Sequence, residues 1–198
     1  GRTHLQDAVP VTLGREFGGY ALAVAKAREH LRRAGALLGE LNLGGTAAGT
    51  GMNAPPRYRG MAIRRLRQWT RLPLTPAENL VERTQSQADF ARLSGAMRDY
   101  ALELIRIAND LRLLTSGPNT GLGEIDLPAV QPGSSIMPGK VNPVIAEMTD
   151  MVGFQVVGHD ATVMMAVQAG QLELNVMMPV IAYNVLQPMR LLTSTSRV

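Results

Sequence analysis

The sequence of 198 residues contains no cysteine. This absence excludes disulfide bonds, thiolate zinc sites and cysteine nucleophiles. A charged-then-apolar signal peptide is also missing, and the most apolar late run, residues 176–189, is too interrupted by proline and asparagine to span a bilayer. We therefore expect a soluble, cytoplasmic protein with no membrane partner. Because the chain opens on GRTHLQDAVP without an initiator methionine, we also expect an internal fragment of a longer protein.

Aromatic residues and lysines are both scarce. Aromatics make up 4% of the chain, against 45% for all hydrophobic residues, and 11 residues are methionine, which predicts an aliphatic interior filled by flexible thioethers. Lys26 and Lys140 are the only lysines among 20 basic residues, the rest being arginine. A lysine in a polar loop of such a chain indicates a specific need for a compact ammonium group.

Long helical periodicity fills most of the sequence. Runs of good helix formers without internal proline predict an all-α fold, a bundle of long helices with negligible strand content. We assign residues 1–198 to one central helical-bundle domain, with glycine- and proline-rich loops at 43–56 and 115–133. The expected helices cover 12–41, 57–70, 93–114, 141–168 and 174–192, the last kinked or interrupted at Pro179 and Pro188.

The clearest periodicity is a heptad seam, which is typical of a helix lying nearly parallel or antiparallel to its neighbours. Long helices with so few aromatic residues also indicate that the bundle buries its faces against further helices, including those of other subunits. The seam consists of Leu93, Met97, Tyr100, Leu104, Ile107, Leu111 and Leu114.

A dense polar loop, PGSSIMPGKVNPV at 132–144, interrupts these periodicities. It offers the hydroxyls of Ser134 and Ser135, the ammonium group of Lys140 and the amide of Asn142. Since the loop leads into the N-terminus of the next predicted helix, where the helix dipole is positive, these donors suit a carboxylate ligand. A plain capping loop, in which one serine caps the helix and the other residues are incidental, also explains the pattern.

Other chemistry-bearing residues leave their roles open. Thr3 and His4 adjoin, and a histidine beside a hydroxyl can bind an anion or carry a proton, although a lone histidine is commonly structural. Glu147 follows Asn142 by about one helical turn, so it either faces the same pocket or is solvated. His30 lies in an arginine-rich helix face and is expected to be solvated.

Three ligand classes are disfavoured by spacing or charge. The glycine-rich segment 44–51 lacks the phosphate-loop spacing, and no predicted strand precedes it. The arginine cluster at 57–71, with Tyr58 and Trp69, suggests a nucleic-acid patch, but a solvated helix face is commoner and the net charge of +4 is low for a dedicated binder. No cluster of His, Asp and Glu has metal-ligand spacing.

Five segments resemble the aspartase/fumarase superfamily. GSSIMPGKVNP at 133–143 is similar to its highly specific signature, G-S-S-x-M-P-x-K-x-N, and GRTHLQDAVP at 1–10 is similar to a second motif. The resemblance covers nearly the whole chain and excludes a nucleic-acid partner. The remaining segments are 42–53, 107–118 and 169–180.

Within the superfamily, the resemblance leans towards aspartate ammonia-lyases, with class II fumarases as the alternative. AGQLELNVM at 169–177, AENLVERTQ at 77–85 and Glu147 after KVNPV resemble the aspartases, whereas His4 fits both. The resemblance implies a homotetramer in which three subunits build each active site. The implied reaction is anti elimination of ammonia from L-aspartate to give fumarate, through an aci-carboxylate intermediate and with no cofactor.

The resemblance also implies a role for each candidate residue. Ser134 would be the general base, carried by a loop over 131–140 that closes as a lid. Lys140 and Asn142 would bind the carboxylate next to the carbanion, and Glu147 would pair with His4 across a subunit boundary. The implied substrate-binding set is Thr3, Ser135, Lys140 and Asn142.

The resemblance has departures and gaps. Asn119–Thr120 stand where the family has Arg–Ala, His159 stands where Asn is usual, and Met178 stands where aspartases carry Glu. The family's N-terminal region and its small C-terminal domain are not in the chain, so we expect these 198 residues alone to be inactive. A non-catalytic structural relative, like the lens crystallins of this superfamily, is a further alternative, although the intact signature loop argues against it.

Overall fold

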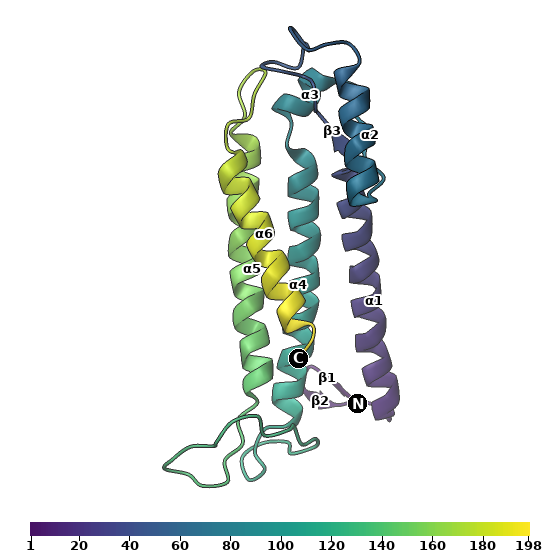
Figure 1. Ribbon diagram of the computed structural model, residues 1–198. Helices are drawn as coiled ribbons and strands as arrows, with labels where there is room; N and C mark the ends of the chain where they lie inside the picture. The colour runs from purple at the N-terminus through teal and green to yellow at the C-terminus, as the bar shows by residue number, and fades with distance from the viewer.

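Long helices form an elongated bundle in the computed structural model, which describes residues 1–198 (Figure 1). In chain order the helices are α1 (Leu13–Leu37), α2 (Tyr58–Thr70), α3 (Leu80–Gln85), α4 (Ala88–Leu114), α5 (Val144–Gln168) and α6 (Met178–Thr195). The central helix α4 contacts α5 and α1, and α6 packs against α5 and α4. The short helices α2 and α3 lie at the end of the bundle opposite the chain termini. The all-α prediction is confirmed.

Strands are confined to four segments of two residues each. They are β1 (Arg2–Thr3) and β2 (Gln6–Asp7), which pair antiparallel, and β3 (Glu40–Leu41) and β4 (Thr75–Pro76), which pair parallel. The predicted extension of the first helix to residue 41 is wrong, because the β3–β4 pairing takes the backbone there. The amide of Thr75 donates to the carbonyl of Gly39 (2.8 Å), and the amide of Ala77 donates to that of Leu41 (2.9 Å).

The heptad seam lies on the packing face of α4. Leu93 and Met97 are buried in the core, and Tyr100 and Leu104 pack against it at half burial. Alanines 101 and 108, which the seam pattern does not include, are also buried and allow α5 to come close. The core lies where α4, α5 and α6 meet, with Ile181 of α6 completely enclosed.

The α5–α6 turn corrects the predicted boundary of the last helix. Asn175 is buried, and its amide nitrogen donates to the carbonyls of Ala166 and Val167 at 3.1 Å. Its carbonyl oxygen accepts from the amide of Met177 at 2.8 Å, so α6 begins at Met178 rather than near residue 174. Pro179 therefore falls in the first helical turn, where proline is tolerated and causes no interruption.

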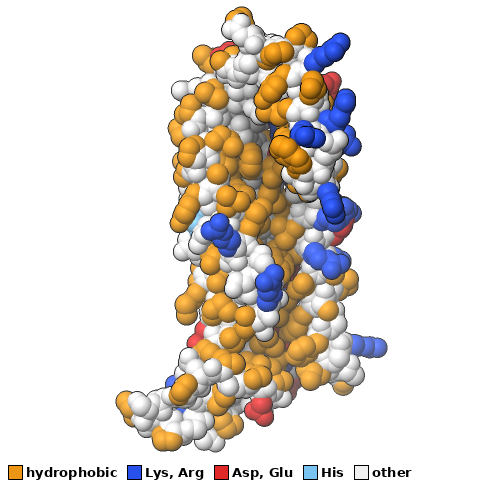
Figure 2. Space-filling view, viewed as in Figure 1, with side chains coloured by type: hydrophobic (Ala, Val, Ile, Leu, Met, Phe, Trp, Pro, Cys, Tyr) orange, Lys and Arg blue, Asp and Glu red, His pale blue; other side chains and the backbone are white.

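Much apolar surface stays open on the bundle. Only 31 of 198 residues are buried, and large apolar side chains such as Phe154 and Leu186 are exposed. Figure 2 shows apolar side chains along a groove between α1 and α6, and a hollow of about 1070 Å³ lies there. Exposed apolar surface on this scale marks an interaction face, which is consistent with the predicted burial against other subunits. None of the helices combines the length and the apolar character needed to cross a membrane.

The arginine-rich segment folds as α2, and its cations are exposed as a solvated helix face would be. Arg64, Arg65 and Arg67 are exposed, and the Arg65 guanidinium lies 5.5 Å from the centre of the Trp69 ring. Arg59 differs, because it is half-buried and donates to the carbonyl of Ala77.

Candidate functional site

All seven candidate residues lie at one end of the bundle. In Figure 1 the hairpin of β1 and β2, the end of α4, the loop over 115–143 and the start of α5 gather at the lower end of the molecule. Segments separated by more than a hundred positions are therefore neighbours. No side-chain hydrogen bond or ion pair joins Thr3 or His4 of the hairpin to the signature loop within the chain.

The signature loop is closed at its base. Gly133 approaches the backbone of Lys140 so closely that a Cβ atom at 133 would overlap the Lys140 carbonyl oxygen. The amide of Lys140 donates to the carbonyl of Met137 (3.2 Å), and Gly139 takes a positive φ of 83° that favours glycine. The two ends of the loop thus meet at its base, as in other compact surface loops.

The two serines of the loop differ in their surroundings. Ser134 is half-buried, and its Oγ accepts hydrogen bonds from the amides of Ile136 (3.2 Å) and Met137 (3.3 Å). Two N–H donors on one oxygen favour its negatively charged form. Ser135 is exposed and makes no side-chain hydrogen bond. Neither serine caps α5, which begins after Pro143 without a side-chain cap, so the plain capping interpretation is wrong.

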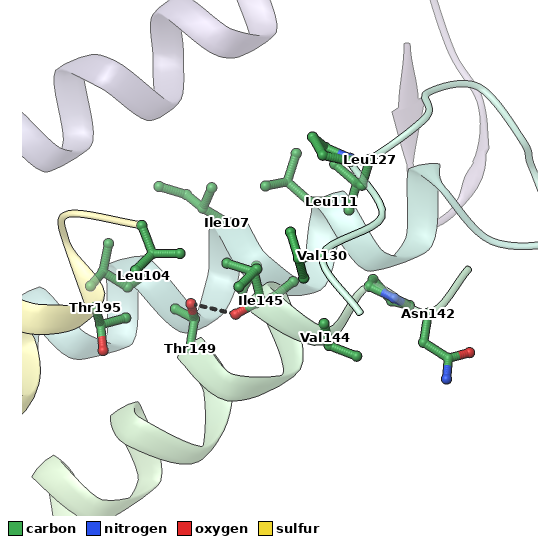
Figure 3. Close-up of a pocket in the computed structure, with 15 residues that line it drawn as sticks. Leu104, Ile107, Leu111, Leu127, Val130, Asn142, Val144, Ile145, Thr149 and Thr195 are labelled. Atoms are coloured by element: carbon green, nitrogen blue, oxygen red, sulfur yellow. Dashed lines mark hydrogen bonds between the residues drawn. The ribbon is translucent and has the colours of Figure 1, made fainter. Parts of the chain in front are cut away.

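Two polar side chains of the loop and one just after it have no partner in the chain. Lys140 is exposed, Asn142 and Glu147 are half-buried, and none of them makes a side-chain hydrogen bond or ion pair. In Figure 3 the Asn142 amide points away from the apolar residues behind it. An ammonium group and an amide that are free to bind fit a carboxylate ligand supplied from outside the chain.

Thr3 and His4 are carried by the β1–β2 hairpin. His4 and Leu5 form its turn with φ of 56° and 59°, the left-handed conformation that a two-residue hairpin turn requires. Both Thr3 and His4 are exposed. His4 has no partner among the other candidate residues, so its pairing with Glu147 across a subunit boundary stays a prediction.

An ion pair that the motifs did not reveal joins the hairpin to the long loop. The Arg2 guanidinium donates from Nη1 to Glu124 Oε2 (3.1 Å) and from Nη2 to Glu124 Oε1. The pairing lowers the pKa of the Glu124 carboxyl and raises that of Arg2. The amino-acid sequence alone contains no signal for this contact, because 122 positions separate the partners and arginine occurs throughout the chain.

An apolar cavity of about 380 Å³ lies behind the loop (Figure 3). The only polar side chains of its wall are Asn142, Thr149 and Thr195, and the Thr149 hydroxyl is already bonded to the Ile145 carbonyl (2.8 Å). Such an apolar wall offers too few polar partners to bind a dicarboxylate. Its apolar lining comes from Leu104, Ile107, Ala108, Leu111, Leu127, Pro128, Val130, Pro143, Val144, Ile145, Ala146 and Val198.

The departures from the family motif lie apart from the loop or at its edge. His159 is buried between α5 and α6, where its Nδ1 lies 2.5 Å from Asn184 Oδ1, so it has a structural environment. Met178 begins α6, at the opposite end of the bundle from the loop. Asn119 and Thr120 lie in the exposed turn after α4.

A family model described as Lyase matches residues 1–158 of this all-α chain. Aspartate ammonia-lyase from Pseudomonas canavaninivorans is 53% identical over 193 residues, which cover 97% of this chain and 41% of that protein. Aspartate ammonia-lyase from Bacillus subtilis is 47% identical over 197 residues, covering 100% of the chain and 42% of that protein.

Two solved structures share the fold over almost the entire chain. A fumarate lyase:delta crystallin from Brucella melitensis superposes with a TM-score of 0.95 at 53% identity, covering 98% of this chain and 42% of that one. A class II fumarase from Schistosoma mansoni superposes with a TM-score of 0.94 at 40% identity, covering 100% of this chain and 44% of that one. The chain belongs to the aspartase/fumarase superfamily of lyases. It spans about two fifths of the length of the relatives it matches.

Proposed function

We propose that the whole protein to which these residues belong eliminates ammonia from L-aspartate to give fumarate. The observation that carries this proposal is the 47–53% identity to aspartate ammonia-lyases over 92–100% of the chain, signature loop included. The free donors of the loop, Lys140 and Asn142, support it, because a dicarboxylate substrate needs cationic and amide partners.

The geometry of the loop supports Ser134 as the general base. As an alkoxide, its Oγ takes the proton from Cβ of aspartate, and the two amides that already point at this oxygen stabilise its negative charge. The electron pair left on Cβ spreads into the adjacent carboxylate and forms a dianionic aci-carboxylate. Lys140 and Asn142 stabilise that charge. The Cα–N bond then breaks, ammonia leaves and the C=C bond of fumarate forms.

The rest of the site involves other copies of the chain. Thr3 and His4 help Lys140 and Asn142 to hold the carboxylate, and Glu147 of one subunit pairs with His4 of another. The open apolar faces of the bundle support a homotetramer, because their exposure in a lone chain would be costly. Closure of the loop over 131–140 then excludes water and completes the site.

Fumarate absorbance tests the proposal in the full-length protein, with L-aspartate and L-malate offered separately. We expect turnover of L-aspartate, whereas turnover of L-malate alone would contradict it. Ser134→Ala should lower kcat by about 10²–10⁴-fold, the usual contribution of a positioned base, with the oligomer intact. Ser194→Ala, at an exposed serine in the last turn of α6, is the matched control and should keep the wild-type rate. Normal turnover by the Ser134 variant would refute the assignment of the base.

Hydration of fumarate is the second candidate function. The class II fumarase from Schistosoma mansoni shares the fold at a TM-score of 0.94, so the bundle and the loop alone are compatible with either leaving group. Turnover of L-malate but not L-aspartate would establish this alternative. Turnover of neither substrate would favour a structural relative of the superfamily.

A further inference from the structure

The hairpin that carries Thr3 and His4 is weakly attached to the bundle. Every residue from 1 to 11 is exposed, and the hairpin's strands are only two residues long. Its other hydrogen bonds are internal, such as the amide of Ala8 donating to the carbonyl of Gly1 (3.0 Å). An isolated hairpin of this size is marginally stable in water, so its position depends on whatever fastens it.

The fastening is the bidentate ion pair between Arg2 and Glu124. These are the only hydrogen bonds that link residues 1–11 to any part of the chain beyond residue 11. Nη1 and Nη2 of Arg2 each donate to a different carboxylate oxygen of Glu124, and this two-point contact fixes the relative orientation of the two side chains as well as their distance. Arg2 directly precedes Thr3 on β1, and Thr3 directly precedes His4. Fixing the position of Arg2 therefore constrains the positions of both residues.

Glu124 is itself held rigidly by the end of α4. Its amide donates to the carbonyl of Leu114 (2.8 Å), and the neighbouring amide of Gly123 donates to that of Ser116 (2.8 Å). The Ser116 hydroxyl also accepts from the amide of Leu122 (3.1 Å). A continuous path of hydrogen bonds thus runs from the last turn of α4 through Glu124 to the hairpin.

We propose that Arg2 and Glu124 are positioning residues, which fix the hairpin so that Thr3 and His4 meet the substrate carboxylate in one orientation. This inference rests on the proposed elimination reaction, because it assigns the pair a purpose in that site. Surface ion pairs contribute little to folding stability, and 33% and 42% of these two side chains are exposed. Their effect is therefore on geometry, where an error of about 1 Å can cost about 10²-fold in rate.

The test uses the full-length protein and two variants of the pair. Glu124→Gln keeps the shape of the side chain but removes its charge, and we expect kcat/KM for L-aspartate to fall by about 10–100-fold with a raised KM. The doubly exchanged protein, Arg2→Glu with Glu124→Arg, restores opposite charges and should recover part of that loss. An unchanged KM in Glu124→Gln would overturn the proposal, and so would an exchanged pair no better than the single variant.

A second readout does not depend on turnover. Amide hydrogen exchange of residues 1–8 should accelerate by about tenfold in Glu124→Gln, while the melting temperature and the oligomer stay as in the wild type. If the wild-type protein turns over neither substrate, the proposed function fails, and this exchange rate still decides whether the pair holds the hairpin. Unchanged exchange would refute the fastening itself.

Glu29→Gln is the matched control. Glu29 binds two arginines, Arg32 and Arg33, on the outer surface of α1, and these bonds lower its pKa to about 2. Glu29 is 38% exposed and Glu124 is 42% exposed, so removing the Glu29 charge breaks the ion pairs of a comparable carboxylate without touching the hairpin. Its KM and its exchange at residues 1–8 should match the wild type, and a change of the size seen in Glu124→Gln would show that any lost surface charge has this effect.

Discussion

The α4–α5 interface and the signature loop differ in whether their polar side chains have partners within the chain. At the interface, Asp160 is 2% exposed and accepts from both the Ser94 hydroxyl (2.7 Å) and the Arg98 guanidinium (2.8 Å). In the loop, the side chains of Lys140 and Asn142 make no hydrogen bond or ion pair. The buried Asp160 is therefore paired within the chain, whereas Lys140 and Asn142 are not.

This difference separates stability from function within one chain. Pairing satisfies buried groups and keeps the helices in register, because an unpaired buried carboxylate costs several kcal/mol. Free donors at a site contribute nothing to folding, but they bind charge that a substrate brings. Substitutions in the two regions should therefore affect different measurements.

The largest effect is expected at the loop. Lys140→Met removes the only ammonium group there, and kcat/KM for L-aspartate should fall by about 10³-fold, as expected for loss of a group that stabilises developing charge. The melting temperature should not change, because Lys140 is exposed and unpaired. Lys26→Met, at the only other lysine, is the control and should retain activity. Equal losses of kcat/KM in the two variants would show that the loop position of Lys140 has no special importance.

In the body of the bundle, the expected effect is on stability. Ile181 of α6 is 0% exposed, so Ile181→Ala leaves a cavity and should lower the free energy of unfolding by about 3 kcal/mol. Urea denaturation measures this, with kcat per folded molecule unchanged. Leu186→Ala, at an exposed position of the same helix, should leave the core intact and act on subunit assembly. A large loss of kcat in folded Ile181→Ala would contradict the expectation that this residue acts on stability alone.

A glycine of the loop probes its closed shape. In Gly133→Ala the new Cβ overlaps the Lys140 carbonyl, so the base of the loop must open. Displacing Ser134 and Lys140 in this way should lower kcat/KM by about 10²-fold without changing the melting temperature. Gly158→Ala, where an added Cβ meets no atom within 4 Å, is the control. Wild-type activity in Gly133→Ala would show that the closed base is dispensable.

The smallest effect is a pH dependence on the exposed surface. Arg32 and Arg33 lower the pKa of Glu29 from 4.5 in a free chain to about 2 in the folded one. A depressed folded pKa means that the ion pairs stabilise above pH 4.5, and that this stability is lost as the pH falls from 4.5 towards 2. Urea denaturation across this range should show wild type and Glu29→Gln converging at the acid end. A constant difference would contradict the assignment.

Part of the fold can be predicted from the sequence, and the parts that cannot be predicted depend on contacts between distant residues. The seam on α4 is visible because burial on one helix face forces a repeat of apolar residues, and Leu93 and Met97 are in the core accordingly. The start of α6 is not visible, because Asn175 fixes it through carbonyls of α5 that no local pattern identifies. The short β3–β4 pair is missed for the same reason, since its partners are distant in sequence.

By itself, the sequence determined the helical bundle, the signature loop and the superfamily, because periodicity and motifs are local and are written in consecutive residues. Only the tertiary structure decided that Ser134 Oγ receives two amides while Ser135 receives none. It alone also showed that Arg2 fastens the hairpin to Glu124. These facts depend on backbone direction and on contacts between distant segments, which the folded chain fixes and the linear order does not.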